Sequence, residues 1–158
     1  MNKPMYTAQG AVLVGDITFG KECSVYYNAV IRADEAPIEI GDRVNIQDLC
    51  LLHVSPGTPM HIGNNVTVGH GAILHSCTID DNVLIGMGSI ILNNAHIPNN
   101  CIVGAGALVT QKKTFPEGSM ILGSPAKAVR PLSDEEIAGI RRNADKYVEW
   151  SAESAKNK

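Results

Sequence analysis

Aliphatic side chains recur at every sixth position through most of this chain. The recurring positions, one of which is phenylalanine, are Phe19, Val25, Ile31, Ile40, Ile46, Leu52, Ile62, Val68, Leu74, Ile79, Ile85, Ile91, Ile97, Val103 and Val109. A period of six matches neither the 3.6-residue turn of an α-helix nor the two-residue alternation of a half-exposed strand. It is typical of a parallel β-helix, in which three short sides form one triangular coil and one aliphatic residue per side points inward. The pattern therefore predicts an all-β solenoid.

Glycine follows many of these aliphatic residues and indicates where the coil turns. The glycines in question are Gly20, Gly41, Gly63, Gly69, Gly86 and Gly104. A turn often needs a positive φ angle, which costs little only for a residue without a Cβ. We therefore expect these glycines to provide positive φ angles at the turns.

Three steps of the repeat are irregular, and all three fall at the same corner of the prism in successive coils. The step from Ile31 to Ile40 is nine residues, that from Leu52 to Ile62 is ten, and that from Leu74 to Ile79 is five. Insertions in solenoids collect on one face, which is often the binding face. We expect functional residues beside this corner.

The repeat region, residues 1–115, is followed by a connection and a helix. Residues 116–132 are rich in proline and glycine and predict a turn-rich connection. Ser133 and Glu136 have the spacing of a capping box. Apolar residues follow at helical spacing, so residues 133–155 are predicted to form an amphipathic helix packed on the β-helix.

Composition and charge limit the kinds of partner. Of the 158 residues only 4% are aromatic and 18% are charged, which favours a core of stacked aliphatic side chains. The net charge of −3, without a basic block, provides no electrostatic footprint for nucleic acid. The first residues lack the apolar segment of a signal peptide, and no apolar run approaches the ~18 residues of a membrane span. We therefore expect a cytoplasmic protein without a membrane partner.

The four cysteines, Cys23, Cys50, Cys77 and Cys101, form no CxxC pair. Structural zinc sites use clustered cysteine spacings, and cytoplasmic thiols are normally reduced. We expect these side chains to be small, buried and free.

Two histidines are predicted to stack on one face of the solenoid. His53 and His75 each follow an aliphatic residue at the same corner of successive coils, and Arg32 has that position one coil earlier. Neighbouring coils are separated by about 4.8 Å, so the two imidazoles can bind one cation at the usual Zn–N distance of about 2.0–2.1 Å. His61 and His96 lie outside this column, and we expect them to be surface hydrogen-bonding residues.

A third histidine belongs to another face. His70 lies two residues after Val68, and Asp48 has the same position one coil earlier. The outward directions of neighbouring sides diverge by about 120° in a three-sided coil, so His70 should not reach the His53–His75 pair within one chain. A neighbouring subunit can supply it, which predicts a trimer with three equivalent interfacial sites.

Four short motifs together resemble the γ-class carbonic anhydrases of the hexapeptide-repeat family. They are R-A-D-E at residues 32–35, N-I-Q-D at residues 45–48, His53, and H-G-A-I-L-H at residues 70–75. The repeat resembles that family over roughly residues 10–115. The resemblance implies a left-handed β-helix, a homotrimer, a Zn²⁺ ion (or Fe²⁺ or Co²⁺) between subunits, and reversible hydration of CO₂ to bicarbonate.

The resemblance also implies roles for individual residues. His53 and His75 of one subunit and His70 of the next would bind the metal, and Gln47 would orient the hydroxide that attacks CO₂. Asn45 corresponds to a polar neighbour of the site, and Glu35 to an acidic residue implicated in proton transfer. Arg32, Asp34 and Asp48 correspond to an interfacial charge network. Tyr147, on the predicted helix, is the candidate for an active-site tyrosine of the family.

One segment departs from the family pattern. The archetype of the family has a long acidic loop after its first histidine, with a second glutamate for proton transfer. Here that loop reads V-S-P-G-T-P-M at residues 54–60, short and uncharged. The resemblance therefore implies metal binding more securely than it implies fast proton export.

Two other functions remain open. The same β-helix is found in CoA-dependent acyltransferases, and G-S-P-A-K at residues 123–127 resembles the segment that follows their coils. Alternatively, the protein could be a catalytically weak assembly module in which the metal holds the subunits together at their interface. Fold alone does not distinguish these functions. Three measurements distinguish them: the metal content, the rate of CO₂ hydration, and thiol release from acetyl-CoA.

Overall fold

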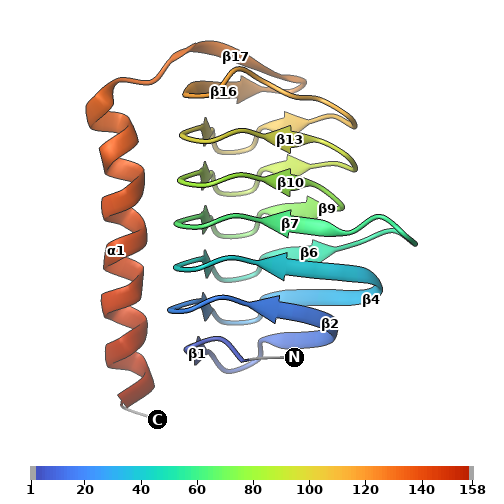
Figure 1. Ribbon diagram of the computed structural model, residues 1–158, viewed down its shortest axis with the longest axis vertical. Helices are drawn as coiled ribbons and strands as arrows, with labels where there is room; N and C mark the ends of the chain where they lie inside the picture. The colour runs from blue at the N-terminus through green and yellow to red at the C-terminus, as the bar shows by residue number, and fades with distance from the viewer. Residues whose placement is uncertain (1–2, 157–158) are drawn as a thin grey trace.

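The computed structural model describes residues 3–156 and is a left-handed parallel β-helix with a C-terminal α-helix along one side, as the sequence predicts (Figure 1). In chain order the strands are β1 (Tyr6–Thr7), β2 (Val12–Phe19), β3 (Ser24–Val25), β4 (Val30–Ile40), β5 (Asn45–Ile46), β6 (Leu51–His53), β7 (Met60–Ile62), β8 (Thr67–Val68), β9 (Ile73–His75), β10 (Thr78–Ile79), β11 (Leu84–Ile85), β12 (Ile90–Ile91), β13 (His96–Ile97), β14 (Ile102–Val103), β15 (Leu108–Val109), β16 (Ser119–Gly123) and β17 (Ala126–Pro131). The helix is α1 (Asp134–Lys156).

The strands stack in three ladders, one for each side of the coil. The first ladder contains β1, β3, β5, β8, β11, β14 and β16. The second contains the first halves of β2 and β4, followed by β6, β9, β12 and β15. The third contains the second halves of β2 and β4, followed by β7, β10 and β13. Strand β4 thus passes around a corner and belongs to two sides.

The core consists of the inward side chains of these ladders. All the aliphatic and phenylalanine positions of the six-residue repeat are at most 4% exposed. Successive members are direct neighbours in the ladder: Ile31 pairs with Leu52, and Leu52 with Leu74. The six-residue spacing therefore predicted the core correctly.

The reason given for the repeat glycines was wrong. The six glycines named from the sequence are absent from the residues with positive φ, whereas Gly71, Gly88 and Gly106, two residues after the repeat glycines of their coils, have it. A Cβ on Gly86 would lie 2.5 Å from the backbone nitrogen of Ala105 in the next coil. The repeat glycines are therefore needed where successive coils approach closely.

Residues 116–132 are more regular than the turn-rich connection expected from the sequence. Strand β16 pairs in parallel with β14 and extends the first ladder, and β17 returns antiparallel along β16. Phe115 and Ile121, both buried, continue the six-residue spacing beyond Val109. Proline and glycine in this segment concealed these two further steps of the repeat.

Helix α1 begins with the predicted capping box. The Glu136 backbone nitrogen donates to the Ser133 hydroxyl oxygen at 3.2 Å, and the Ser133 nitrogen donates to the Glu136 carboxylate at 2.9 Å. Arg130 also binds that carboxylate through two nitrogens, and with these hydrogen bonds it lowers the pKa of Glu136 to about 2. The start of the helix is thereby tied to the last strand.

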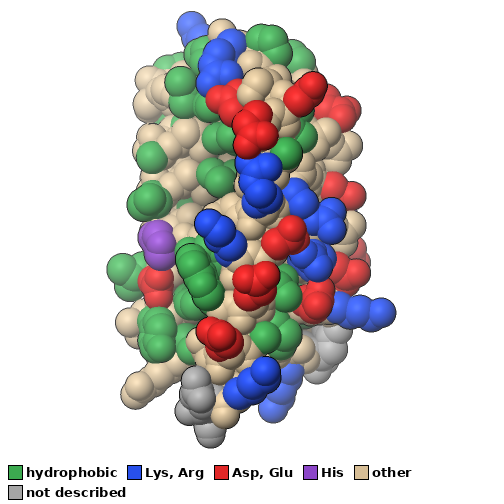
Figure 2. Space-filling view, turned by 90° about the vertical axis from the view of Figure 1, so that its left-hand side faces the viewer, with side chains coloured by type: hydrophobic (Ala, Val, Ile, Leu, Met, Phe, Trp, Pro, Cys, Tyr) green, Lys and Arg blue, Asp and Glu red, His purple; other side chains and the backbone are tan. Residues whose placement is uncertain are grey.

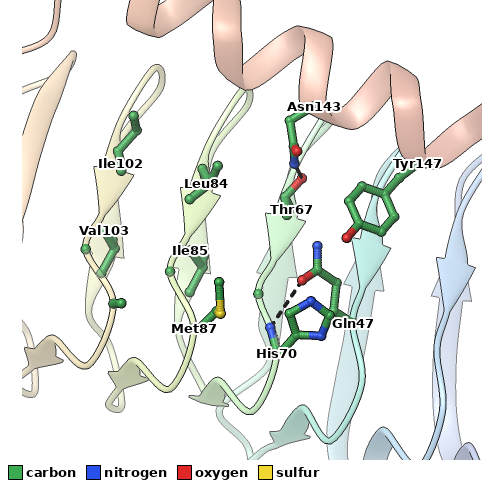
Figure 3. Close-up of a pocket in the computed structure, with 14 residues that line it drawn as sticks. Gln47, Thr67, His70, Leu84, Ile85, Met87, Ile102, Val103, Asn143 and Tyr147 are labelled. Carbon is green, nitrogen blue, oxygen red and sulfur yellow. Dashed lines mark hydrogen bonds between the residues drawn. The ribbon is translucent and has the colours of Figure 1, made fainter.

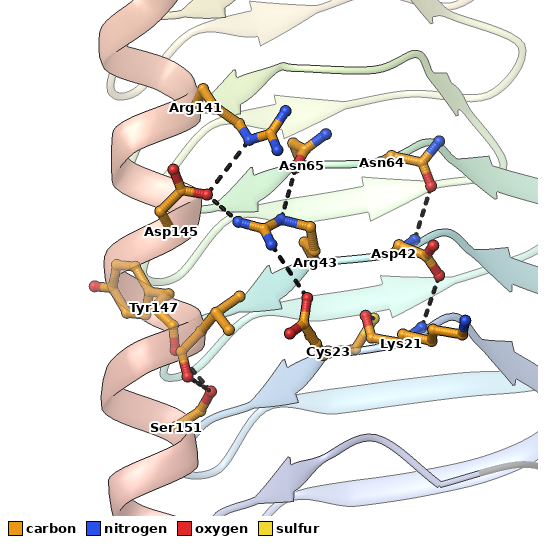
Figure 4. Close-up of polar contacts among 12 residues, drawn as sticks. Lys21, Cys23, Asp42, Arg43, Asn64, Asn65, Arg141, Asp145, Tyr147 and Ser151 are labelled. Atoms are coloured by element: carbon orange, nitrogen blue, oxygen red, sulfur yellow. Dashed lines mark hydrogen bonds and ion pairs between the residues drawn. The ribbon is translucent and has the colours of Figure 1, made fainter.

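The helix then runs back along the first ladder, where it contacts β1, β3, β5 and β8 (Figure 1). Arg43 binds Asp145 of the helix, and also Glu22 and Asn65 of the neighbouring coils (Figure 4). Acidic and basic side chains are intermingled over this face (Figure 2). Among the described residues, no helix has both the length and the apolar character to span a membrane.

The four cysteines are free and buried, as expected. Burial raises the pKa of the Cys50 thiol to about 11 and that of Cys77 to about 12. Because the thiolate is the reactive form, these side chains act as packing groups.

Replacing Gly86 with alanine tests the close approach of the coils. The added Cβ forces adjacent coils apart, and we expect the free energy of unfolding to fall by about 1–3 kcal/mol. Gly88→Asn is the matched control, because Gly88 has a φ of +66° and open space around it, and asparagine tolerates that conformation. Urea unfolding measures the stability of both variants. Equal losses of unfolding free energy in the two would contradict the steric explanation.

Candidate functional site

His53 and His75 meet on the outer face of the second ladder. They are Cα partners in neighbouring strands β6 and β9, and Arg32 of β4 is the partner of His53 on the other side. The Nδ1 atom of His53 lies 3.0 Å from Nε2 of His75. The column predicted from the repeat thus brings two imidazole nitrogens together.

The other ring nitrogen of each histidine has a polar partner. Nε2 of His53 lies 3.2 Å from an oxygen of Asp34, and Nδ1 of His75 lies 2.7 Å from the side-chain oxygen of Asn93. Arg32 binds the same Asp34 carboxylate and, with a smaller contribution from His53, holds the pKa of that carboxyl below its ordinary value. We call Arg32, Asp34, His53 and His75 the first half-site.

His70 lies at the turn that follows the first ladder. Its Nδ1 atom is 2.8 Å from a carboxylate oxygen of Asp48, and its side chain is 46% exposed. Its backbone nitrogen donates to the side-chain oxygen of Gln47 at 3.2 Å. Asp48 also accepts from the Tyr27 backbone nitrogen at 3.2 Å. His70 is therefore oriented by the coil beneath it, while its imidazole faces outward.

A buried polar network connects Gln47 to the helix. Gln47 donates to the Asn45 side-chain oxygen at 3.1 Å, and Asn45 donates to the Thr67 hydroxyl at 2.8 Å. Asn143 of α1 donates to the same hydroxyl at 2.9 Å. Because Gln47, Asn45 and Thr67 are each at most 5% exposed, the network holds the Gln47 amide in one orientation.

A pocket of about 370 Å³ opens beside this network, between α1 and the first ladder. Gln47, Thr67, His70, Asn143 and Tyr147 form its polar end (Figure 3). Burial raises the pKa of Tyr147, and the nearby Asp48 adds to this effect. The phenol therefore stays protonated at neutral pH and can donate a hydrogen bond. We call Asn45, Gln47, Asp48, His70 and Tyr147 the second half-site.

The two half-sites lie on different sides of the chain. Within residues 3–156, no group of three or more histidine, cysteine, aspartate or glutamate side chains is arranged to hold a metal ion. His70 follows β8 of the first ladder, whereas His53 and His75 are paired in β6 and β9 of the second ladder. Within the chain Arg32 pairs with Asp34, while Asp48 binds His70.

The remaining predicted residue, Glu35, follows Asp34 in β4 and is exposed. Its backbone oxygen accepts from the Gly57 nitrogen at 3.4 Å, so it lies next to the loop that follows His53. His61 and His96 bind Glu39 and Asp80 on the third ladder, outside both half-sites.

The donor atoms of the first half-site fit a metal ion. Two nitrogen ligands of a tetrahedral zinc ion lie about 3.3 Å apart when each Zn–N distance is about 2.0–2.1 Å. The facing nitrogens of His53 and His75 are 3.0 Å apart. Histidines that bind metals usually donate their other N–H to an oxygen, as Asp34 and Asn93 allow here.

Sequence reasoning missed three polar residues that surround the site: Thr67, Asn93 and Asn143. Asn93 lies one coil after Ser76, the neighbour of His75, and the repeat register alone could have indicated it. Asn143 reaches the network only because α1 packs on the first ladder, which the repeat does not predict.

Curated relatives match nearly the whole chain. A Methanocaldococcus jannaschii protein named probable carbonic anhydrase is 53% identical over 151 residues, which cover 96% of this chain and 95% of that protein. A Geobacillus kaustophilus protein named carbonic anhydrase is 48% identical and covers 91% of this chain and 79% of its own length.

Family and structural comparisons agree on the fold. The family described as bacterial transferase hexapeptide (six repeats) matches residues 76–111. A solved Bacillus cereus structure that bears an acetyltransferase name superposes with a TM-score of 0.94 and 44% identity, and it covers 96% of this chain and 88% of that one. Proteins similar to this chain therefore bear both carbonic anhydrase and acetyltransferase names.

Replacing Thr67 with valine tests the buried network. The variant removes the hydroxyl shared by Asn45 and Asn143, and leaving buried donors unpaired costs about 1–3 kcal/mol. Thr78→Val is the control, because Thr78 is the first residue of β10, as Thr67 is of β8, and is partly buried. We expect urea unfolding to show a larger loss of unfolding free energy in Thr67→Val than in Thr78→Val. Equal losses would contradict the network.

Proposed function

The chain belongs to the γ-class carbonic anhydrase-like proteins of the hexapeptide-repeat family, and from this premise we propose that it hydrates CO₂ reversibly to bicarbonate at metal sites between the subunits of a homotrimer. The observation that best supports this is the His53–His75 pair, whose facing nitrogens are 3.0 Å apart. Within residues 3–156 no third histidine, cysteine, aspartate or glutamate completes a metal site with this pair, and His70 lies partly exposed at the turn after the first ladder.

We assign the metal to His53 and His75 of one subunit and His70 of the neighbouring subunit. Zn²⁺ is the ion we expect, with Fe²⁺ or Co²⁺ as alternatives, because imidazole suits all three. Such an ion, when bound, activates a water molecule, whose pKa falls to about 7 in zinc carbonic anhydrases, the reference case for this effect.

Exposed apolar side chains support the assembly. Tyr27, Leu49 and Met87 are 49%, 66% and 61% exposed, and they lie along the turns that flank Asp48 and His70. Leu49 also has a φ of +62°. Hydrophobic side chains are visible along the left-hand edge of the helix face in Figure 2. Exposed apolar side chains gathered on one face favour an interface, which here would bring a second chain to His70.

The second half-site would orient the reactants. Gln47 uses one amide N–H and one oxygen lone pair within the chain, and its second N–H can hold the attacking water. Tyr147 faces the same pocket (Figure 3) and can donate to a substrate oxygen. Asn45 holds Gln47 in place.

The first half-site would balance charge and move protons. Arg32 and Asp34 keep the imidazole of His53 in position, and together with Asp48 they would form the charged rim of the interface. Glu35 is the exposed carboxylate next to the loop after His53 and would accept the released proton. That loop bears no carboxylate, so we expect slower proton export than an acidic loop would allow.

An acyltransferase is the second candidate, favoured by the acetyltransferase name of the similar Bacillus cereus structure. It would use His70 as a base at the pocket and bind CoA without a metal. The third candidate is a catalytically weak assembly module whose subunits are held together by the metal. Thiol release from acetyl-CoA would support the second candidate, and tight zinc binding without CO₂ hydration would support the third.

We also place the protein in the cytoplasm, where free thiols such as those of its buried cysteines are normal.

The His70→Ala variant tests the proposed function. Losing a hydrogen-bond partner of a ligand alone weakens metal binding 10–100-fold, so losing a ligand should cost more than about 100-fold and abolish CO₂ hydration. Stopped-flow hydration and zinc content are measured after loading with zinc or iron, and circular dichroism checks the fold. His96→Ala, outside both half-sites, should behave like the wild type. A His70→Ala protein with stoichiometric zinc would refute the assignment.

A further inference from the structure

We propose that Asn93 is a positioning residue, which selects the tautomer of His75 that leaves Nε2 free to bind the metal. This inference rests on the proposed function and concerns a residue that none of the sequence motifs includes. Asn93 does not face the His53–His75 gap itself; it acts through the far side of one imidazole.

The geometry around Asn93 fixes its side-chain orientation. Its oxygen lies 2.7 Å from Nδ1 of His75, and its amide nitrogen donates to the Ser55 hydroxyl at 2.9 Å. Because the amide nitrogen is used by Ser55, the oxygen faces the imidazole. An oxygen only accepts hydrogen bonds, so Nδ1 of His75 must carry the proton.

The consequence appears on the other side of the ring. A neutral imidazole with its proton on Nδ1 has a lone pair on Nε2. That atom is the one 3.0 Å from His53, at the position where a metal would bind. Without Asn93, the proton could move to Nε2 and be donated to Nδ1 of His53, which would leave no lone pair on Nε2 for a metal.

Ser55 links this arrangement to the loop after His53. The Ser55 backbone nitrogen donates to the Ser76 hydroxyl at 2.8 Å, and that hydroxyl donates to the Thr58 carbonyl oxygen at 2.9 Å. Ser76 directly follows His75 in the chain. The short loop at residues 54–60 therefore supports Asn93, although it lacks the acidic residues expected of the family archetype.

The chain offers a matched control on another ladder. His96 pairs with Asp80 at 2.7 Å, the same distance as the His75–Asn93 contact, yet it lies outside both half-sites. Removing Asp80 disturbs a histidine of the same kind without touching the proposed site.

The test compares zinc affinity, by competition with a chelator, in the full-length wild type and three variants. Asn93→Leu removes the acceptor, and we expect its zinc affinity to fall 10–100-fold. Asn93→Asp keeps an acceptor and should stay within about threefold of the wild type, because an oxygen still faces Nδ1. Asp80→Ala should bind zinc like the wild type. Equal affinities for Asn93→Leu and the wild type, or an equal loss in Asp80→Ala, would overturn the proposal.

A second readout needs neither metal nor activity. Nitrogen-15 NMR of the metal-free protein reports which ring nitrogen of His75 carries the proton. We expect Nδ1–H in the wild type and Asn93→Asp, and a shift toward Nε2–H in Asn93→Leu. An unchanged tautomer in Asn93→Leu would overturn the inference even if zinc binds, whereas a wild type that binds no zinc would refute the proposed function and leave the tautomer result standing.

Discussion

Backbone hydrogen bonds between successive coils determine where every outward side chain lies, and the candidate site depends on them. The Leu51 nitrogen donates to Ala72, and the Ser76 nitrogen to His53, each at 3.0 Å. This register stacks Arg32, His53 and His75 in one column, with the coil spacing of about 4.8 Å that brings two imidazoles into contact. The same register keeps His70 on another ladder. A rigid three-sided coil can therefore hold two parts of a site, but it cannot join them within one chain.

The two half-sites are held in place by different physical means. The first relies on the charged pair Arg32–Asp34 at the surface, where isolated ion pairs contribute little to stability. The second relies on neutral amides and a hydroxyl, buried between the first ladder and α1. Since buried polar groups are costly when unpaired, docking of the helix and orientation of Gln47 depend on each other. The capping box and the Arg43–Asp145 contact thus stabilise the site as well as the fold.

The repeat predicted most of this architecture from the sequence. Its spacing identified the buried residues, the stacking of His53 with His75, and the placement of His70 above Asp48, because a solenoid converts spacing along the chain directly into position. Two expectations were wrong for local reasons. Gly86 relieves a contact between coils and does not need a positive φ, and Ile121 continues the repeat inside a segment rich in proline and glycine.

Other features were beyond sequence reasoning. Asn143 reaches Thr67 only after the helix has packed, and Asn93 reaches back to His75 from the following coil through a side-chain contact. The register could have placed Asn93 beside Ser76, but it does not predict the helix packing that brings Asn143 to Thr67 or the side-chain contact between Asn93 and His75. Metal binding by His53, His70 and His75 stays a prediction, as do the roles of Gln47, Glu35 and Tyr147.

Mixed trimers measure the central claim most directly. One subunit type has His70→Ala, the other has His53→Ala with His75→Ala, and neither type alone can form a complete site. In a cyclic trimer that contains both types, one complete site forms. The account predicts that co-refolded mixtures regain about one third of the wild-type zinc content and CO₂ hydration per mixed trimer. Mixtures that regain neither, or a parent protein that already binds zinc like the wild type, would contradict it.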